Sequence, residues 1–322
     1  MEIENSYKGK RILITGGSGF IGSHLIEEFL KLGAKVFIFV KKESDLWRIK
    51  HLKERIEIFY PDYNKRESLN NLLNEVNPEI IFNLLAITKQ ERNPDLLEKI
   101  IENNFLSTFK LINALKTNPF MKLNLFVNIG TCEEYGDGEV PFLENQREIA
   151  VSPYSLSKVF QSHLASYLSK IEKFPIVTVR PFLTYGPKQI NDLFIPYIIR
   201  SFLKEEKIHT TKMEQTRDLI YVDDVISALL KIPFSNIKFG EIINIGSGVE
   251  TKMMDLVKKI AGICKKNYQD YVIIDKPYRQ GETIHFYCSN EKARKLLKWA
   301  PETSLEEGLK KTIQWNREFL KI

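Results

Sequence analysis

The sequence contains little cysteine, with only three thiols in 322 residues. They stand far apart and never in CxxC spacing, so the sequence predicts neither a disulfide framework nor a zinc site. The histidines also lack the paired spacing of metal ligands, and we expect no bound metal. Such a chain suits a reducing compartment, and we expect it in the cytoplasm. The cysteines are Cys132, Cys264 and Cys288, and the histidines are His24, His51, His163, His209 and His285.

Long apolar runs and concentrated charge are also scarce. No segment approaches the roughly 20 apolar residues that span a bilayer, and the first ten residues carry no long apolar run, so we expect no membrane anchor. The formal net charge is only +6 and is spread along the chain, which disfavours nucleic acid as a partner. A group of lysines falls instead on the solvated face of one predicted helix. These are Lys258, Lys259, Lys265 and Lys266.

A glycine-rich loop follows the first predicted strand, residues 11–15, and opens a predicted helix. Its spacing fits both GxxGxxG and GxGxxG. Glycines are needed where the chain turns tightly and where backbone amides approach a pyrophosphate, whose charge then rests on the helix N-terminus. The order of strand, loop and helix therefore predicts a dinucleotide-binding site. The loop consists of Gly16, Gly17, Ser18, Gly19, Phe20, Ile21 and Gly22.

Apolar strands alternate with amphipathic helices through the first half of the chain. This alternation is typical of an α/β fold with a doubly wound parallel sheet, the Rossmann arrangement. We expect a dinucleotide-binding domain of residues 1–182 with a return segment 215–248. Residues 183–214 and 249–322 would form a smaller substrate domain, with the ligands in the cleft between them. The predicted strands are 11–15, 36–40, 56–60, 79–85, 124–130 and 176–180, and the predicted helices are 21–32, 65–74, 94–117 and 153–172.

A phenol, an ammonium and a hydroxyl form a candidate hydride-transfer set. Tyr154 and Lys158 stand four residues apart on a predicted helix, so both face one side, and Thr131 precedes them in the chain. A phenol with an ordinary pKa of about 10 needs a shift of roughly three units to act as a base near neutrality, and a nearby ammonium supplies much of it. Thr131 would hold a substrate hydroxyl or carbonyl against the phenol.

Together with further motifs, these elements resemble the extended short-chain dehydrogenases of the nucleotide-sugar epimerase and dehydratase family over nearly the whole chain. The resemblance implies an NAD(P)-dependent enzyme that acts on a nucleoside-diphosphate sugar. It also implies a homodimer formed through the helices predicted at 94–117 and 153–172. The matching motifs are Asp62-Tyr63, the segment 83–86, Asn104 with Thr108, the Tyr-Gly-Pro turn at 185–187, and the segments 217–225, 244–248 and 279–282.

The resemblance also implies individual roles for residues outside the glycine loop. Besides Tyr154 and Lys158, the expected cofactor contacts are Lys41, Lys42, Asp62, Tyr63, Leu85, Ala86, Asn104 and Pro181. The expected substrate contacts are Thr184 and two arginines, Arg217 and Arg279, whose guanidinium forks fit phosphate oxygens. An alternative is that either arginine braces the fold by pairing with Asp218, Asp223 or Glu282.

The end of the second predicted strand bears on the cofactor. NAD-binding members carry an acid there to hold the ribose diol, but this chain has Val40, followed by Lys41 and Lys42. Absence of the acid removes repulsion toward a 2′-phosphate, and two ammonium groups attract it. The sequence therefore favours NADP(H), with NAD(H) as the alternative.

The segment after Thr131 bears on the reaction. Cys132 stands where dTDP-sugar dehydratases carry the acid that protonates the leaving water, whereas Glu133 matches their base. Thr-Cys-Glu-Glu-Tyr-Gly looks more like the Ser-Ser-Glu-Glu-Tyr-Gly of GDP-4-keto-6-deoxymannose reductases. We therefore favour an NADPH-dependent reductase of a nucleotide-linked 4-keto-6-deoxyhexose. A 4-epimerase and a 4,6-dehydratase are the alternatives, and Leu183, where many relatives have a substrate-touching Asn, leaves the sugar open.

Two functions from other classes of protein remain open as alternatives. The chain could bind NADP(H) as a sensor or scaffold without catalysis, although that role has no need of the complete Thr131, Tyr154 and Lys158 set. It could also oxidise small alcohols or a lipid-like substrate, although Arg217 and Arg279 fit a diphosphate better.

Overall fold

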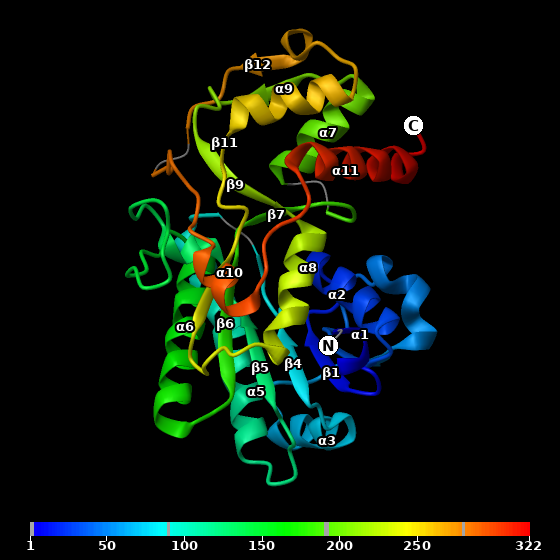
Figure 1. The fold of residues 1–322 in the computed structure, drawn as a ribbon, viewed down its shortest axis with the longest axis vertical. Helices are drawn as coiled ribbons and strands as arrows, with labels where there is room; N and C mark the ends of the chain where they lie inside the picture. Colours follow the sequence, from blue (N-terminus) through cyan, green and yellow to red (C-terminus); the bar gives the residue numbers. More distant parts are fainter. Residues whose placement is uncertain (1–2, 89–90, 190–192, 279–280) are drawn as a thin grey trace.

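A parallel sheet of seven strands forms the centre of the protein. The computed structural model describes residues 3–88, 91–189, 193–278 and 281–322. The strand order is β10-β6-β5-β4-β1-β2-β3, so the direction of winding reverses between β1 and β4 (Figure 1). Ligands of open α/β sheets bind beyond the carboxyl ends of the strands at such a reversal. The strands are β1 Arg11–Thr15, β2 Lys35–Phe39, β3 Glu57–Phe59, β4 Ile80–Asn83, β5 Leu125–Ile129, β6 Ile176–Pro181 and β10 Ile242–Ile245.

Helices cover both faces of this sheet, because successive strand residues point to opposite sides. Ile12 and Ile14 pack in the cluster that includes helices α2 and α8, whereas Leu13 packs in the cluster formed with α3, α5 and α6. Both faces are therefore apolar, as a parallel sheet requires. The helices named here are α2 Phe20–Lys31, α3 Arg66–Val76, α5 Ser107–Lys116, α6 Pro153–Glu172 and α8 Val222–Lys231.

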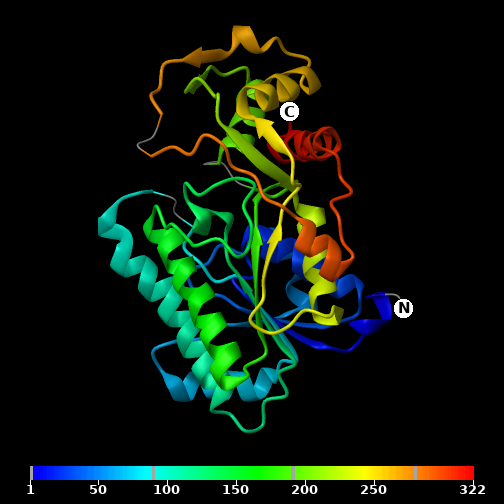
Figure 2. The same cartoon turned by 60° about the vertical axis from the view of Figure 1, so that its left-hand side comes forward.

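The small sheets and the helices α7, α9 and α11 lie beyond the carboxyl end of the central sheet (Figure 1 and Figure 2). β9 pairs in parallel with β7 and antiparallel with β11, so this small sheet joins segments from both of the expected domains. β8 pairs with β12. Elsewhere in the chain α10 Glu291–Leu297 packs beside β10 and α8. The bounds of the remaining elements are β7 Leu183–Tyr185, β8 Ile208–Thr210, β9 Thr216–Tyr221, β11 Glu250–Lys252, β12 Val272–Ile274, α7 Phe194–Lys204, α9 Met253–Ile263 and α11 Leu305–Leu320, and those of the short helices are α1 Ile3–Ser6, η1 Trp47–Arg55, η4 Cys132–Tyr135, η5 Ile232–Phe234 and η6 Tyr268–Asp270.

The doubly wound parallel sheet predicted from the sequence is confirmed, and each predicted strand is present within two residues of its expected bounds. The single helix predicted at 94–117 is wrong. That segment contains η2 Pro94–Leu96, α4 Leu97–Ile100, the π-helical η3 Ile101–Leu106 and then α5. The carbonyl oxygen of Asn104 accepts hydrogen bonds from Thr108 Oγ1 at 2.7 Å and Gln161 Nε2 at 2.7 Å, which accompany the change in helical winding.

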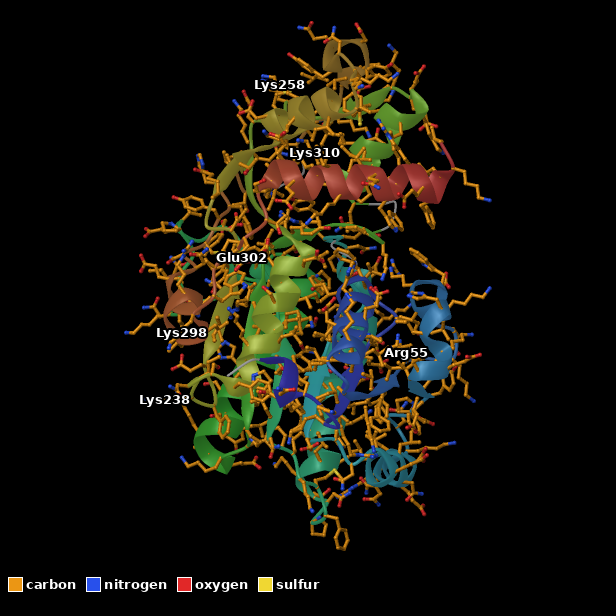
Figure 3. All side chains as sticks on the ribbon, turned by 45° about the vertical axis from the view of Figure 1, so that its right-hand side comes forward. Arg55, Lys238, Lys258, Lys298, Glu302 and Lys310 are labelled. Atoms are coloured by element: carbon orange, nitrogen blue, oxygen red, sulfur yellow. The ribbon has the colours of Figure 1, made fainter. Side chains whose placement is uncertain are left out.

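Surface charge is spread over separate elements, as Figure 3 shows for Lys258 on α9 and Lys310 on α11. Within the described residues, no helix combines the length and the apolar character needed to cross a bilayer. The same part of the chain contains no group of three or more His, Cys, Asp or Glu side chains placed to hold a metal ion.

Gly22 and Gly262 provide a matched pair of helix glycines. A Cβ at Gly22 would lie 2.8 Å from the Gly16 carbonyl oxygen and 2.9 Å from Gly17 Cα, whereas a Cβ at Gly262 would meet no atom within 4 Å. We predict that Gly22→Ala lowers the free energy of unfolding by about 1–3 kcal/mol through overpacking against backbone. Gly262→Ala should raise it by up to about 1 kcal/mol through helix propensity. Urea denaturation measures both, and equal effects would contradict the close approach at Gly22.

Candidate active site

A cavity of about 1470 Å³ opens at the carboxyl end of the sheet, between the sheet and the elements beyond it. Its volume exceeds that of a typical site for one small ligand, so it can hold two ligands together. Most residues that the sequence singled out line it. These are Gly16, Ser18, Gly19, Phe20, Ile21, Gly22, Lys41, Leu85, Ala86, Thr131, Cys132, Glu133, Tyr154, Lys158, Pro181, Thr184 and Arg217.

The glycine loop forms one wall of this cavity. Gly16 has a φ of +67°, and a Cβ there would lie 2.8 Å from the Leu84 carbonyl oxygen, so the turn requires glycine. Gly19 begins α2 without a side-chain cap, and the first amides of the helix border the cavity. Uncapped amides at a helix N-terminus bind anionic groups. The loop therefore fits the pyrophosphate of a dinucleotide.

Other predicted cofactor contacts lie outside the main cavity. Lys42, Asp62 and Tyr63 line a second cavity of about 670 Å³, which shares Lys41 with the first. Gly17 packs inward, since a Cβ there would lie 2.9 Å from Ile38 Cγ2.

Asn104 is buried and lines neither cavity. Its Oδ1 accepts a hydrogen bond from the Ile87 amide at 2.7 Å, and its Nδ2 donates to the Ile87 carbonyl at 3.2 Å. Ile87 borders both cavities. Asn104 thus fixes the Ile87 backbone at the edge of both cavities, and its own side chain does not border either cavity.

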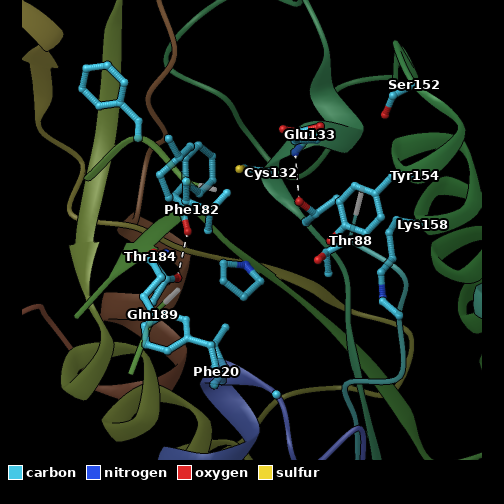
Figure 4. Close-up of a pocket in the computed structure, with 18 of the residues that line it drawn as sticks. Phe20, Thr88, Cys132, Glu133, Ser152, Tyr154, Lys158, Phe182, Thr184 and Gln189 are labelled. Atoms are coloured by element: carbon cyan, nitrogen blue, oxygen red, sulfur yellow. Dashed lines mark hydrogen bonds between the residues drawn. The ribbon is translucent and has the colours of Figure 1, made fainter. Parts of the chain in front are cut away.

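Helix α6 presents Tyr154 and Lys158 to the cavity (Figure 4). Ser152 and Ser155 form a capping box at its start, which fixes the direction of the helix. Lys158 Nζ donates to the Ile129 carbonyl at 2.8 Å and to Gln161 Oε1 at 3.1 Å. Burial lowers the pKa of Lys158 to about 8, because a desolvated ammonium loses its proton more easily.

Tyr154 lies beside Thr131, which comes from the loop after β5. Burial raises the pKa of Tyr154 above its ordinary value and the Glu133 carboxylate raises it further, whereas a hydrogen bond with Thr131 lowers it. The phenol therefore keeps its proton at neutral pH, and the expected lowering of its pKa by Lys158 is wrong for this structure, because burial and the Glu133 charge raise it. The predicted hydroxyl, phenol and ammonium are together in space, and this arrangement is suited to proton transfer at a carbonyl or alcohol oxygen.

Glu134 holds the loop of Thr131 and the helix of Tyr154 together by hydrogen bonds. It is fully buried, and its Oε1 accepts a hydrogen bond from the Thr131 amide at 2.8 Å. Its Oε2 accepts from Ser162 on α6 at 2.6 Å and from Arg180 Nη2 on β6 at 2.8 Å. One carboxylate therefore connects the loop of Thr131 to the helix of Tyr154.

Cys132 and Glu133 line the cavity next to Thr131 (Figure 4). The Glu133 amide donates to Thr131 Oγ1 at 3.3 Å. Burial raises the pKa of the Cys132 thiol well above its ordinary value, and the charge of Glu133 adds to the effect. This thiol is therefore a weak acid.

Arg217 reaches the cavity from β9 but is already paired. Its guanidinium forms an ion pair with Glu282 and donates to the Thr283 carbonyl at 2.9 Å. The pairing with Glu282 agrees with the alternative in which Arg217 braces the fold. It also holds the guanidinium in position at the cavity, where it could contact a phosphate. Arg279 lies outside the described residues.

Gln189 and Arg48 are among the cavity residues that the sequence did not reveal. Gln189 is buried beside Thr184, and its Oε1 has no hydrogen-bond partner among the described residues. Arg48 reaches the cavity from η1. Neither belongs to a motif that fixes its position, so only the folded chain reveals them.

The geometry defines a class of protein: a doubly wound α/β enzyme with a glycine-loop anion site and a Thr–Tyr–Lys set. The GDP-mannose 4,6 dehydratase family profile matches residues 13–312, and the chain belongs to this family, within the extended short-chain dehydrogenases. The predicted family and enzyme class are thereby confirmed.

Individual relatives agree with this assignment. A UDP-N-acetyl-alpha-D-glucosaminuronate decarboxylase of Bacillus cytotoxicus is 31% identical, with 96% of this chain and 98% of the relative covered. A dTDP-D-glucose 4,6-dehydratase of Dictyostelium discoideum is 30% identical, with 95% and 81% covered. An epimerase structure from Methanothermobacter thermautotrophicus superposes with a TM-score of 0.89 at 28% identity, covering 100% of this chain and 96% of that one. The UDP-glucuronic acid 4-epimerase of Bacillus cereus, solved with UDP-glucuronic acid and NAD, has a TM-score of 0.85 at 27% identity, covering 96% and 99%.

The buried ammonium leads to a pH prediction. Lys158 should be charged below pH 8 and neutral above it, so a reaction that delivers a proton through Tyr154 should slow as pH rises. We expect kcat/KM for ketone reduction to be constant below about pH 8 and to fall by about tenfold per unit above it. Lys158→Met should have lower activity, and its kcat/KM should not fall as the pH rises above about 8. A flat profile to pH 10 in the unchanged enzyme would contradict the role of Lys158.

Proposed function

We propose that this enzyme is an NADPH-dependent reductase of a nucleotide-linked 4-keto-6-deoxyhexose. The observation that carries the proposal is Cys132, a buried thiol at the position where dTDP-sugar 4,6-dehydratases carry an acid. Elimination of water needs a group that readily gives its proton to the leaving hydroxide. A thiol whose pKa is raised well above its ordinary value does this poorly. Reduction of a ketone needs no such acid.

The residues present fit a nicotinamide dinucleotide. The glycine loop would hold its pyrophosphate, and Leu85, Ala86 and Pro181 would line its path across the cavity. When bound, the reduced nicotinamide supplies a hydride for the sugar carbonyl carbon. The NADP(H) preference rests on Val40 and Lys41, because Val40 directly follows β2 where an NAD-binding relative carries an acid, and the Lys41 ammonium borders the cavity.

The side chains would share the remaining steps. Thr131 Oγ1 and the Tyr154 hydroxyl would hold the carbonyl oxygen, and Tyr154 would give it a proton as the carbon accepts hydride. Lys158 would stabilise the phenolate that this transfer leaves. Arg217 and Arg279 would bind the diphosphate, and the Arg217–Glu282 ion pair would keep Arg217 aligned before the substrate arrives.

Glu133 favours a second candidate, a 4,6-dehydratase. Its side chain lines the cavity beside Tyr154, where a dehydratase carries the base that removes the C5 proton. A 4-epimerase shares the same hydride site and requires neither acid nor base at these positions.

One assay separates the three reactions. Purified protein is incubated with 4-keto and 4-hydroxy sugar nucleotides carrying UDP, GDP, CDP or dTDP, with and without NADPH. We predict that a 4-keto substrate gains two hydrogen atoms while an equal amount of NADPH is oxidised. Tyr154→Phe should lower kcat by roughly 10²–10⁴-fold. Loss of water without added NADPH would instead identify a dehydratase, and a product of unchanged mass an epimerase.

We further propose a cytoplasmic homodimer that associates through α5 and α6. Phe109 on α5 and Phe160, Tyr167 and Ile171 on α6 are all exposed apolar side chains. Covering them removes apolar surface from water. We predict a dimer mass by light scattering and a monomer for Tyr167→Glu, whereas Phe319→Glu on α11 should leave the mass unchanged. A monomeric unchanged protein would contradict the proposal.

A further inference from the structure

Arg48 is a cation at the edge of the main cavity that no sequence motif identifies. It stands on η1, and its guanidinium borders the cavity together with Ser18, Lys41 and Ser44. Arg48 Nη1 approaches the Ser18 carbonyl at 3.4 Å, which places the guanidinium beside the glycine loop. The Ser44 hydroxyl accepts a hydrogen bond from the Lys41 amide at 3.1 Å, which orders the turn after β2.

No carboxylate within the described residues forms an ion pair with this arginine. Its hydrogen-bond acceptors are two carbonyl oxygens, those of Ser18 and Lys188, and neither carries a formal charge. The Glu27 carboxylate on the neighbouring helix α2 is engaged by Lys188 Nζ at 2.6 Å and His51 Nε2 at 2.9 Å. Burial lowers the pKa of Arg48, and the charge of Asp45 opposes this effect. The half-buried guanidinium therefore borders the cavity with its charge only partly offset.

The side chain is also held in position. Arg48 Nε donates to the Lys188 carbonyl at 2.9 Å, and its guanidinium carbon lies 4.6 Å from the centre of the Trp47 ring. Trp47 in turn contacts Trp315 and Phe319 of α11, with ring centres 6.4 and 5.5 Å away. An arginine stacked and bonded in this way has already lost much of its rotamer freedom before a ligand arrives.

The position of Arg48 in the fold indicates which part of a bound dinucleotide would lie next to it. The Gly16 amide donates to the Phe39 carbonyl at 2.9 Å, so the glycine loop and the turn after β2 are neighbours. β2 lies three strands from β5, which at the usual spacing is about 14 Å from the Thr131 side of the cavity. With the pyrophosphate at α2, the nicotinamide would lie toward β5 and the adenosine ribose toward β2.

We propose that Arg48, with Ser44 and Lys41, binds the 2′-phosphate of NADP(H) and sets the selectivity for this cofactor. The inference rests on the proposed function for the presence of a dinucleotide and goes beyond it in naming the residue that discriminates. The planar guanidinium offers paired N–H groups to a phosphate, and the Ser44 hydroxyl adds a neutral donor. Selectivity would thus come from η1 and not only from the lysines that follow β2.

The test compares Arg48→Gln with Arg55→Gln, an exposed arginine of the same helix (Figure 3). Dissociation constants for NADPH and NADH are measured by fluorescence titration, and those for the fragments 2′,5′-ADP and 5′-AMP by competition. Arg48→Gln should weaken NADPH and 2′,5′-ADP by roughly 10- to 100-fold and leave NADH and 5′-AMP unchanged. Arg55→Gln should change none of them. Arg48→Lys should fall between, because it keeps the charge but not the fork.

The outcomes separate this inference from the cofactor preference itself. If the unchanged protein binds NADH as tightly as NADPH, the NADP(H) preference is wrong and the inference falls with it. If the unchanged protein prefers NADPH and both Arg48 variants keep that preference, the inference alone is overturned. Equal weakening of NADPH and NADH would show that Arg48 only braces η1 against Lys188, which also overturns it. Melting temperatures of all variants establish that the compared proteins are folded.

Discussion

The carboxylate of Glu134 has hydrogen-bond partners on three separate elements and no access to solvent. Removing a carboxylate and the Arg180 guanidinium from water costs several kcal/mol for each ion, and the arrangement is stable only because these partners are close and well directed. Gly130 lacks a side chain where a Cβ would collide with Glu134 Oε1. The loop of Thr131, the middle of α6 and β6 are therefore tied together. This buried ion pair therefore helps to hold Thr131 and Tyr154 in their relative positions.

A second network joins the ammonium to the cavity floor. Lys158 donates to Gln161, Gln161 donates to the Asn104 carbonyl, and the Asn104 side chain holds the Ile87 backbone. The π-helical turn at η3 is part of this connection, since it occurs where that carbonyl accepts side-chain donors. An irregular helix thus contributes to the placement of Lys158, and π-helical turns are frequent at functional sites.

The sequence predicted what depends on local periodicity or on a compact motif. The alternation of Ile12, Leu13 and Ile14 between two cores and the glycine loop at the start of α2 both follow from short stretches of chain. Features that depend on distant partners could not be predicted. The break in the helix predicted at 94–117 involves Gln161, and the position of Arg48 depends on how η1 packs beside Ser18. Likewise, Arg217 offered two alternatives until β9 was placed against Glu282.

The order of strands has a consequence for biosynthesis. β6 ends at Pro181, but its outer neighbour β10 is supplied only at Ile242–Ile245, after the chain has left the sheet and returned. On the ribosome, the backbone edge of β6 therefore waits for some sixty residues to be translated before it is covered, and unpaired strand edges favour aggregation. Slow translation or a weakened β10 would thus reduce the yield of native protein even where every residue of the main cavity is intact.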